Sequence, residues 1–514
     1  MFFLIVAADR AVVALKSGSR RSLIAAGLWI AAAFQCYMLE AWAIWPALIV
    51  AWLVASPSPL RKRILDLLLA GSISFVASLS WILLVTLTPA SSRPWVGGSN
   101  GNSAFEMVFG YNGLGRFGQL AGSTPTTTST TSYRGFAAPF GGSAGWGRLF
   151  NDQVAGQIAW LMPAAIISIA IVMWAVLRLR PYFVDRAPAV FFAAWFVIYG
   201  TMFSLSSGIH QFYTAALAPA IAALVAGAVV IAARSSHWYG RVGVGVMLLG
   251  TTTYASYVTQ QSGGYATWAP AVQFVLAMLA LAAVVYRPRR LLHGVPFVLA
   301  AALAFTPAVW AVDAVNHPSS INPIAGPGTG MGMGSAAGRG GFGPGGSGPG
   351  TFDPRGGGFG QPPQGSSGGL RPDDPGQGAG TGRPGPGSAN GLAAGGAIGL
   401  NDYNADLVAW LKAHRGNARF LFATFGAMSA APYITATGEN VLPIGGFDGA
   451  DPSPTQAQIK AWVASGDLKY ILTGGQGGGS QGGTAGSSEV RQWVEANCTS
   501  VTDAPVSNLM QCTA

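Results

Sequence analysis

The chain has 514 residues, of which 50% are hydrophobic and only 9% are charged. Soluble domains carry about 25% charged residues, so this composition excludes an ordinary soluble protein and indicates a membrane protein. The formal net charge of +10 does not indicate nucleic-acid binding, because the Lys and Arg residues stand in short clusters between apolar runs, where the positive-inside rule expects them.

Residues 1–313 alternate between apolar segments and short basic turns, which predicts a helical region embedded in the lipid bilayer. About ten membrane segments are predicted by length and composition: 1–15, 22–37, 39–56, 64–88, 153–177, 187–206, 211–233, 241–260, 266–286 and 293–313. The first is short, and no positive charge precedes it as in a signal peptide. We therefore expect it to be the tail of a helix whose beginning is absent from this chain.

The basic turns predict the orientation of these segments. One cluster falls at every second connection: Lys16/Arg20/Arg21, Arg61/Lys62/Arg63, Arg178/Arg180/Arg186, Arg234/Arg241 and Arg287/Arg289/Arg290. If all of them are cytoplasmic, the remaining connections face outward. The loop 89–152, the turn near 206–211 and everything after residue 313 are then extracytoplasmic, and the protein is a multi-pass protein of the cell membrane.

Residues 314–399 differ from both flanks in composition. They are rich in Gly and Pro and poor in apolar residues, and Gly follows no strict three-residue period, which excludes a collagen helix. Such a segment cannot bury enough apolar surface to fold. We therefore expect a disordered, flexible linker.

Globular patterning returns over residues 400–514. Helices are predicted over 402–411, 455–465 and 487–496, and strands over 419–424 and 469–473. Ser453 or Thr455 is expected to cap the second helix. Because strands and helices alternate, this part is predicted to be a small α/β domain with a mainly parallel sheet. The expected fold class is thus a polytopic α-helical membrane protein, then a Gly/Pro-rich linker, then a small extracytoplasmic α/β domain.

Cys498 and Cys512 lie close together near the end of the chain. A disulfide between them would close a small loop, which suits a domain outside the cytoplasm. The alternative is two unpaired buried thiols. The sequence favours the disulfide, because the charge pattern places the tail outside.

Loop 89–152 is the outward stretch with the most candidate binding residues. It contains Arg93, Tyr111, Asn112 and Arg116. Aromatic faces stack on sugar rings, amides hydrogen-bond to hydroxyl groups, and the guanidinium of Arg pairs with phosphate oxygens, so these residue types suit a sugar together with a phosphate. The alternative is that the loop packs as a lid on the membrane helices.

Two further polar positions lie at predicted outward turns. His210, followed by Tyr213, opens an apolar helix, where it could bind phosphate or carry a proton. Glu40 lies between two short apolar segments, where a carboxylate is either functional or simply solvated at the interface. A structural role is the alternative for each.

These motifs resemble those of the bacterial polytopic glycosyltransferases of family 39, a mannosyltransferase group of the glycosyltransferase C superfamily that is related to protein mannosyltransferases and aminoarabinose transferases. The segments that carry the resemblance are 38–42 (MLEAW), 92–99 (SRPWVGGS), 109–116 (FGYNGLGR), 208–219 (GIHQFYTAALAP) and 431–452. The resemblance covers nearly the whole chain.

The resemblance implies a membrane enzyme that takes a hexose-type, mannose-like sugar from a polyprenyl-phosphate carrier. The sugar passes to an acceptor of the cell envelope outside the membrane, without a nucleotide sugar. Arg93, Tyr111, Asn112 and Arg116 map onto the family's outer-loop motif. His210 and Tyr213 map onto its His-Pro-Tyr-Tyr type run. All six are therefore predicted to bind substrate.

The resemblance also implies a catalytic carboxylate in the family's first outer loop, often with a divalent metal ion. That loop precedes everything in this chain, so no catalytic residue is assigned and no metal ligands are predicted within it. We expect the missing helices to belong to a longer form of the protein or to a partner chain. The chain departs from the family at Tyr37, where Lys is usual, and at Glu40, where Gln is usual.

Two other functions remain open at this point. The chain could be a catalytically degenerate or accessory membrane protein whose tethered domain binds a glycan or a partner. A transporter is a weaker hypothesis, because the intramembrane charges of an ion path are almost absent and no internal repeat is evident.

Overall fold

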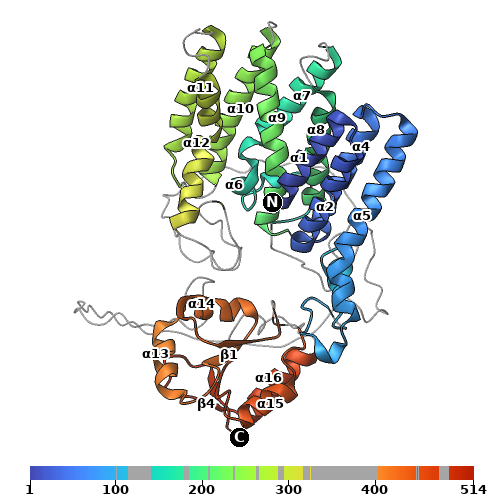
Figure 1. The fold of residues 1–514 in the computed structure, drawn as a ribbon. Coiled ribbons are helices and arrows are strands. Elements are labelled where there is room, and N and C mark those ends of the chain that lie inside the picture. Colours follow the sequence, from blue (N-terminus) through green and yellow to red (C-terminus); the bar gives the residue numbers. More distant parts are fainter. Residues whose placement is uncertain are drawn as a thin grey trace, which may run out of the picture. The chain divides into compact units, whose positions relative to one another are not determined.

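The computed structural model describes residues 1–99, 101–113, 141–178, 185–206, 209–234, 238–261, 265–286, 294–316, 325, 403–446, 449, 451–473 and 485–513. The described residues up to 316 form a helical region, and those from 403 to 513 form an α/β domain (Figure 1). Nearly all of the predicted linker 314–399 lies outside the described residues.

The helical region contains twelve α-helices among the described residues: α1 (Phe2–Ser17), α2 (Arg20–Tyr37), α3 (Leu39–Trp42), α4 (Ile44–Ala55), α5 (Leu60–Leu87), α6 (Ala155–Ile158), α7 (Met162–Arg178), α8 (Arg186–Leu205), α9 (Ala218–Arg234), α10 (Trp238–Gln261), α11 (Ala269–Tyr286) and α12 (Val295–Asn316). Short 3-10 turns add η1 (Ala90–Ser92), η4 (Arg148–Phe150), η5 (Ala159–Leu161) and η6 (Gln211–Leu217), and η2 (Glu106–Tyr111) is a π-helix.

Within the described part of the chain, five helical stretches are long and apolar enough to cross a membrane: Leu60–Leu87, Ala155–Arg178, Arg186–Leu205, Gln211–Ile231 and Ala269–Tyr286. Each segment predicted from the sequence coincides with a helix. The prediction that about ten of them span the bilayer is not confirmed, since the others are shorter or more polar. Leu39–Ala55 and Phe297–Val312, for example, are apolar but short.

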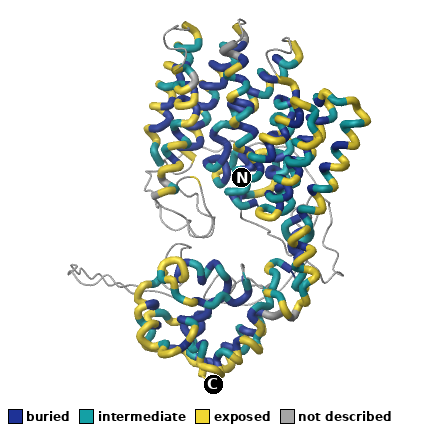
Figure 2. The backbone as a smooth tube through the Cα atoms, viewed as in Figure 1, coloured by how far each residue is buried: buried dark blue, intermediate teal, exposed yellow. Residues whose placement is uncertain are grey.

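The helices pack through small residues and keep many large apolar side chains on the outside. Neighbouring pairs include α1 with α2, α2 with α5, α4 with α8, and α11 with both α10 and α12. Ala residues dominate the buried positions, whereas Leu68, Val76 and Leu84 of α5 are more than 60% exposed (Figure 2). Small residues let helix backbones approach, and an apolar exterior suits contact with lipid, so this packing is that of a membrane protein.

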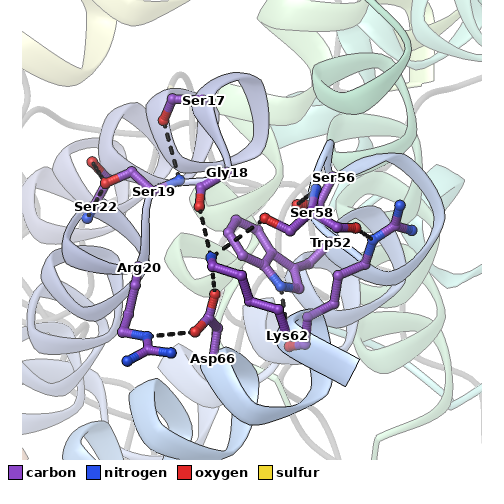
Figure 3. Close-up of polar contacts among 11 residues, drawn as sticks. Ser17, Gly18, Ser19, Arg20, Ser22, Trp52, Ser56, Ser58, Lys62 and Asp66 are labelled. Carbon is purple, nitrogen blue, oxygen red and sulfur yellow. Dashed lines mark hydrogen bonds and ion pairs between the residues drawn. The ribbon is translucent and has the colours of Figure 1, made fainter. Parts of the chain in front are cut away.

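A buried carboxylate joins three helices at one end of the region (Figure 3). Asp66 of α5 is fully buried and pairs with Arg20 at the start of α2 and with Lys62, whose Nζ lies 2.7 Å from Asp66 Oδ2. Lys62 also donates to the carbonyl of Gly18 at 3.2 Å. Gly18 ends α1 in the left-handed region, and a side chain there would come within 2.8 Å of Ser58 Oγ. The pairs therefore hold the α1–α2 turn against the start of α5.

Replacing Asp66 with Ala should lower the free energy of unfolding by about 3 kcal/mol, because two cationic groups lose a buried partner. Unfolding of the full chain in detergent measures the loss. Asp9→Ala is the matched control, since the Asp9–Arg10 pair is solvent-exposed and should contribute less than about 1 kcal/mol. Equal effects of the two substitutions would show that the Asp66 pairs do not hold these helices together.

The α/β domain is built on a five-stranded sheet in the order β2-β1-β3-β5-β4. Its strands and helices are α13 (Ala405–His414), β1 (Phe422–Phe425), α14 (Ala427–Thr437), β2 (Val441–Ile444), α15 (Gln456–Ala464), β3 (Tyr470–Leu472), α16 (Ala485–Asn497), β4 (Thr499–Ser500) and β5 (Leu509–Gln511). β2, β1 and β3 are parallel, with Phe422 opposite Val441 and Ala423 opposite Ile471, whereas β5 is antiparallel to β3 and β4. The predicted parallel sheet is thus correct for three strands, and the antiparallel pair at the end was not foreseen.

Both faces of this sheet are covered, because successive strand residues point to opposite sides. Phe422 belongs to one apolar cluster with Leu411 and Tyr433, and Ala423 belongs to a second cluster with Ile459. The predicted helices and strands of this domain are present, and Thr455 caps α15 in a reciprocal capping box with Gln458. α14 and β2 were not predicted, because each contains a Pro, Pro432 and Pro443 respectively, which is unusual inside a regular element.

Two links tie the ends of this domain to its core. Cys498 and Cys512 form a disulfide. Glu439, just after α14, pairs with Lys412 at 3.0 Å and with Arg415 at 2.7 Å, near the end of α13. Hydrogen bonds from these two cationic side chains lower the pKa of the Glu439 carboxyl from its usual value.

This pKa shift gives the α/β domain a pH-dependent contribution to stability. Since the folded-state pKa is lowered, the stabilisation is present above about pH 4.3, the ordinary value for Glu, and is lost as the pH falls through the folded-state pKa. We expect about 1 kcal/mol for this partly exposed cluster. Protection of the α13 amides against hydrogen exchange, corrected for intrinsic rates, should decrease on acidification in the wild type. In Glu439→Gln this protection should be lower at neutral pH and should lack that pH-dependent component. An unchanged profile in the variant would contradict the assignment.

Candidate functional site

Three distant segments of the helical region enclose a cavity of about 480 Å³. They are the α2–α3 junction, the loop after η2, and the stretch from the end of α8 to η6. The residues that line it are Cys36, Tyr37, Met38, Leu39, Glu40, Asn112, Gly113, Met202, Phe203, Ser206, Ile209, Phe212 and Tyr213. Its volume lies within the range of about 300–1,000 Å³ that is usual for small-molecule sites.

A break between α2 and α3 forms one wall of the cavity. Met38 has φ 50°, an uncommon backbone conformation for a residue other than Gly, and it separates the two helices. α3 is a single turn that carries Glu40. The hydroxyl of Tyr199, a fully buried residue of α8, donates to the Glu40 carbonyl at 2.8 Å and fixes this turn. The break therefore holds Glu40 at the cavity.

An aromatic cluster forms another part of the cavity wall. The rings of Tyr37 and Tyr213 meet edge to face with their centroids 5.4 Å apart. The His210 ring stacks on Phe212 at 5.3 Å and contacts Tyr213 edge-on at 5.2 Å. Tyr213 thus lines the cavity, whereas His210 does not line it and contacts two residues that do, Phe212 and Tyr213.

Asn112 brings an amide into the same cavity. Its Nδ2 donates to the sulphur atoms of Met107 at 3.3 Å and Met38 at 3.6 Å. The amide therefore connects the loop after η2 to the α2–α3 break. Two of the six predicted substrate-binding residues, Asn112 and Tyr213, consequently line one cavity although about a hundred residues separate them.

Arg93 and Tyr111 occupy other positions. The guanidinium of Arg93 donates to the carbonyls of Val85 at 2.7 Å and Thr88 at 3.1 Å, and also to that of Asn102, so it caps the end of α5. The Tyr111 ring lies against Gly98. Neither residue lines the cavity. Arg116, the remaining predicted residue, lies outside the described residues.

Sequence analysis did not identify Arg148, which supports the cavity wall. This residue is only 3% exposed and donates to the carbonyls of Phe203 and Ser206, two lining residues at the end of α8, and to that of Gly142 at 2.7 Å. Burial lowers the pKa of its guanidinium from the usual value. A cation at the C-terminal end of a helix is stabilised by the helix dipole. In the sequence, Arg148 is one of several basic residues in loop 89–152, and nothing in its local pattern distinguishes it from the others.

Close backbone approach makes Gly113 a sensitive point of the cavity. A Cβ atom there would come within 2.5 Å of both Leu39 Cδ1 and the Phe109 carbonyl oxygen. Gly113→Ala should therefore displace the Asn112 loop and weaken ligand binding in the cavity by at least about tenfold. Gly145→Ala is the control, because a Cβ there meets nothing within 4 Å. Ligand affinity equal to that of wild type in Gly113→Ala would show that the loop does not shape the site.

The described residues contain no group of three or more His, Cys, Asp or Glu side chains that could hold a metal ion. The cavity itself offers one carboxylate, that of Glu40. Divalent cations with oxygen ligands require more donors than this. The residues that line the cavity therefore do not fit the divalent ion that the family resemblance implies.

The apolar helices, the cavity between them and the appended α/β domain define the class as a polytopic membrane protein with a small α/β domain. A family described as "Putative mannosyltransferase YkcB-like, C-terminal" matches residues 407–497, within the α/β domain.

The similarity to curated proteins extends over nearly the whole chain. Over 97% of its length the chain is 26% identical to "Putative mannosyltransferase YkcB" of Bacillus subtilis (strain 168), of which the match covers 72%. It is 25% identical over 98% of its length to "Putative mannosyltransferase YycA" of the same strain, of which 75% is covered. The resemblance to mannosyltransferase-type proteins that the sequence predicted is thereby confirmed. No solved structure matches the chain.

Proposed function

We propose that this chain acts in a membrane glycosyltransferase that moves a mannose-like hexose from a polyprenyl-phosphate donor to a cell-envelope acceptor outside the membrane. The observation that supports this most directly is the cavity. It collects Glu40, Asn112 and Tyr213 from three separate motifs of the family resemblance. The names of the two relatives support the transfer of mannose, and the apolar helices support a lipid-linked donor.

The lining of the cavity suits one hexose. The rings of Tyr37, Phe212 and Tyr213 offer apolar faces to the C–H groups of a sugar. The Glu40 carboxylate accepts hydrogen bonds, and the Asn112 amide both donates and accepts, so together they can satisfy neighbouring hydroxyl groups. A neutral sugar thus finds suitable partners in the cavity, whereas the phosphate of the donor needs a cationic partner from outside the residues that line it.

The proposed reaction is an inverting displacement. The oxygen of an acceptor hydroxyl attacks the anomeric carbon, the bond from that carbon to the phosphate oxygen breaks, and polyprenyl phosphate leaves with the bonding electrons. A carboxylate takes the proton of the hydroxyl as general base. We assign Glu40 to sugar binding and not to this base, because the family that the chain resembles usually has Gln at this position.

Removing a hydroxyl or an amide from the cavity should reduce transfer. We expect Tyr213→Phe and Asn112→Leu each to lower kcat/KM by roughly tenfold, which corresponds to about 1.4 kcal/mol of transition-state stabilisation. The assay uses native membranes that contain this protein, with mannosyl-phosphoryl-polyprenol as donor and a membrane fraction as acceptor. Tyr286→Phe is the matched control, since Tyr286 is 82% exposed at the end of α11.

The same assay separates the proposed function from the accessory alternative. The proposal is supported if wild type transfers the sugar, both cavity variants transfer it more slowly, and the control variant matches wild type. Transfer that is unaffected by both variants would place the site elsewhere. A complete absence of transfer with a donor and acceptor that a related enzyme uses would contradict the catalytic function and favour the accessory protein.

A further inference from the structure

A second cavity, distinct from the first, lies between α10 and α11 and has a volume of about 660 Å³. Its lining surface is mainly apolar, but six of the ten residues that line it carry hydroxyl or amide groups. Its polar lining residues are Thr252, Thr253, Ser256, Thr259, Gln260 and Thr267. We call this cavity the hydroxyl groove. Helix carbonyls can satisfy the hydrogen atoms of such hydroxyl groups, and the oxygen atoms that face the cavity can also bind a polar occupant.

The hydrogen atoms of three of these hydroxyl groups are already used. Thr252 donates to the Leu248 carbonyl at 2.9 Å, Ser256 to the Thr252 carbonyl at 3.2 Å, and Thr259 to the Ala255 carbonyl at 2.7 Å. A hydroxyl oxygen that has donated its proton still carries lone pairs that accept. With the hydroxyl groups of Thr253 and Thr267 and the amide of Gln260, the groove therefore offers both acceptors and donors, which suits a ligand whose groups do both.

The charge of the lining restricts the ligand further. None of the residues that line the hydroxyl groove is Asp, Glu, Lys, Arg or His. A phosphate or carboxylate group accepts hydrogen bonds and needs cationic partners, and an ammonium group needs anionic ones. An uncharged polyhydroxyl compound, whose O–H groups donate, matches this lining. Phe274 and Pro270 on the α11 side add apolar surface for the C–H face of a sugar ring.

The position of the groove agrees with an extracytoplasmic ligand. Its polar residues lie in the last turns of α10 and just before α11, whereas Arg241 lies at the start of α10 and Arg287 follows α11 in sequence. If the basic ends are cytoplasmic, as the positive-inside rule expects, the groove lies toward the outer side of the membrane.

From these observations we infer that the hydroxyl groove binds the uncharged glycan part of the acceptor, either as a free oligosaccharide or as the headgroup of a glycolipid. The identification of this glycan as the acceptor rests on the proposed function. The binding of a neutral glycan does not, because it follows from the groove itself.

Direct binding tests the inference without any transfer reaction. The full chain in lipid nanodiscs is titrated with mannobiose, followed by saturation-transfer NMR, and separately with dimannosyl diacylglycerol, followed by native mass spectrometry. The first probe reports a free glycan and the second a lipid headgroup. The test variant is Ser256→Ala combined with Thr259→Val, which removes two hydroxyl groups with little change in volume. Thr251→Val is the matched control, because Thr251 is a buried residue of the same helix that does not line the groove.

We expect at least one probe to bind wild type and the control, and the double variant to bind that probe at least about tenfold more weakly. Binding should change little with ionic strength, since no charged side chain takes part. Melting temperatures of all proteins should agree, which separates lost binding from misfolding. Failure of both probes to bind wild type at millimolar concentration, or equal binding by the double variant, overturns the inference.

The transfer assay distinguishes this inference from the proposed function. If wild type transfers mannose and the double variant keeps the acceptor KM of wild type, the groove is not the acceptor site while the proposed function stands. If the double variant loses glycan binding but wild type shows no transfer, the groove is a glycan site and the proposed function fails. A rise in the acceptor KM with kcat unchanged supports both.

Discussion

The requirement that a charge removed from water must find a partner governs much of the helical region. Asp66 is fully buried and takes two cationic partners from neighbouring turns. Arg148 and Arg93 are surrounded instead by backbone carbonyls at the ends of α8 and α5. Asp66 and Arg148 thereby join a helix end to a segment distant in sequence, whereas Arg93 ties the end of α5 to the loop that follows it. Because an unpaired charge in such surroundings costs several kcal/mol, these pairs restrict how the helices can pack.

The candidate site follows from interruptions of these helices. A continuous helix satisfies its own backbone and presents side chains to lipid or to neighbouring helices. The α2–α3 break at Met38, the loop at Asn112 and the turn before η6 each end a helix, and all three border the same cavity. Irregular backbone at this depth is tolerated where it is enclosed by protein. The breaks and the cavity are therefore one feature of the fold.

Two cavities among the described residues of the helical region differ in chemistry. The first combines aromatic rings with a carboxylate and an amide, and the second combines hydroxyl groups with an apolar wall and no charge. A transferase that joins a lipid-linked sugar to a glycan needs two such sites, one for each substrate. The proposed function and the inferred acceptor groove are in this respect consistent, although different residues carry them.

The sequence by itself determined the class of this protein and much of its architecture. Hydropathy and basic turns indicated the longer helices of the helical region, and periodicity indicated most elements of the α/β domain, because both signals are local along the chain. The motifs also pointed to Asn112 and Tyr213. Only the tertiary structure decided that these two share a cavity with Glu40, that Arg93 caps α5, and that Arg148 supports the cavity wall. The hydroxyl groove could not be predicted from the sequence either, since the Thr and Ser residues of α10 line a cavity only when α11 packs beside them. Contacts between segments far apart in sequence depend on how whole helices pack, and no local pattern records that packing.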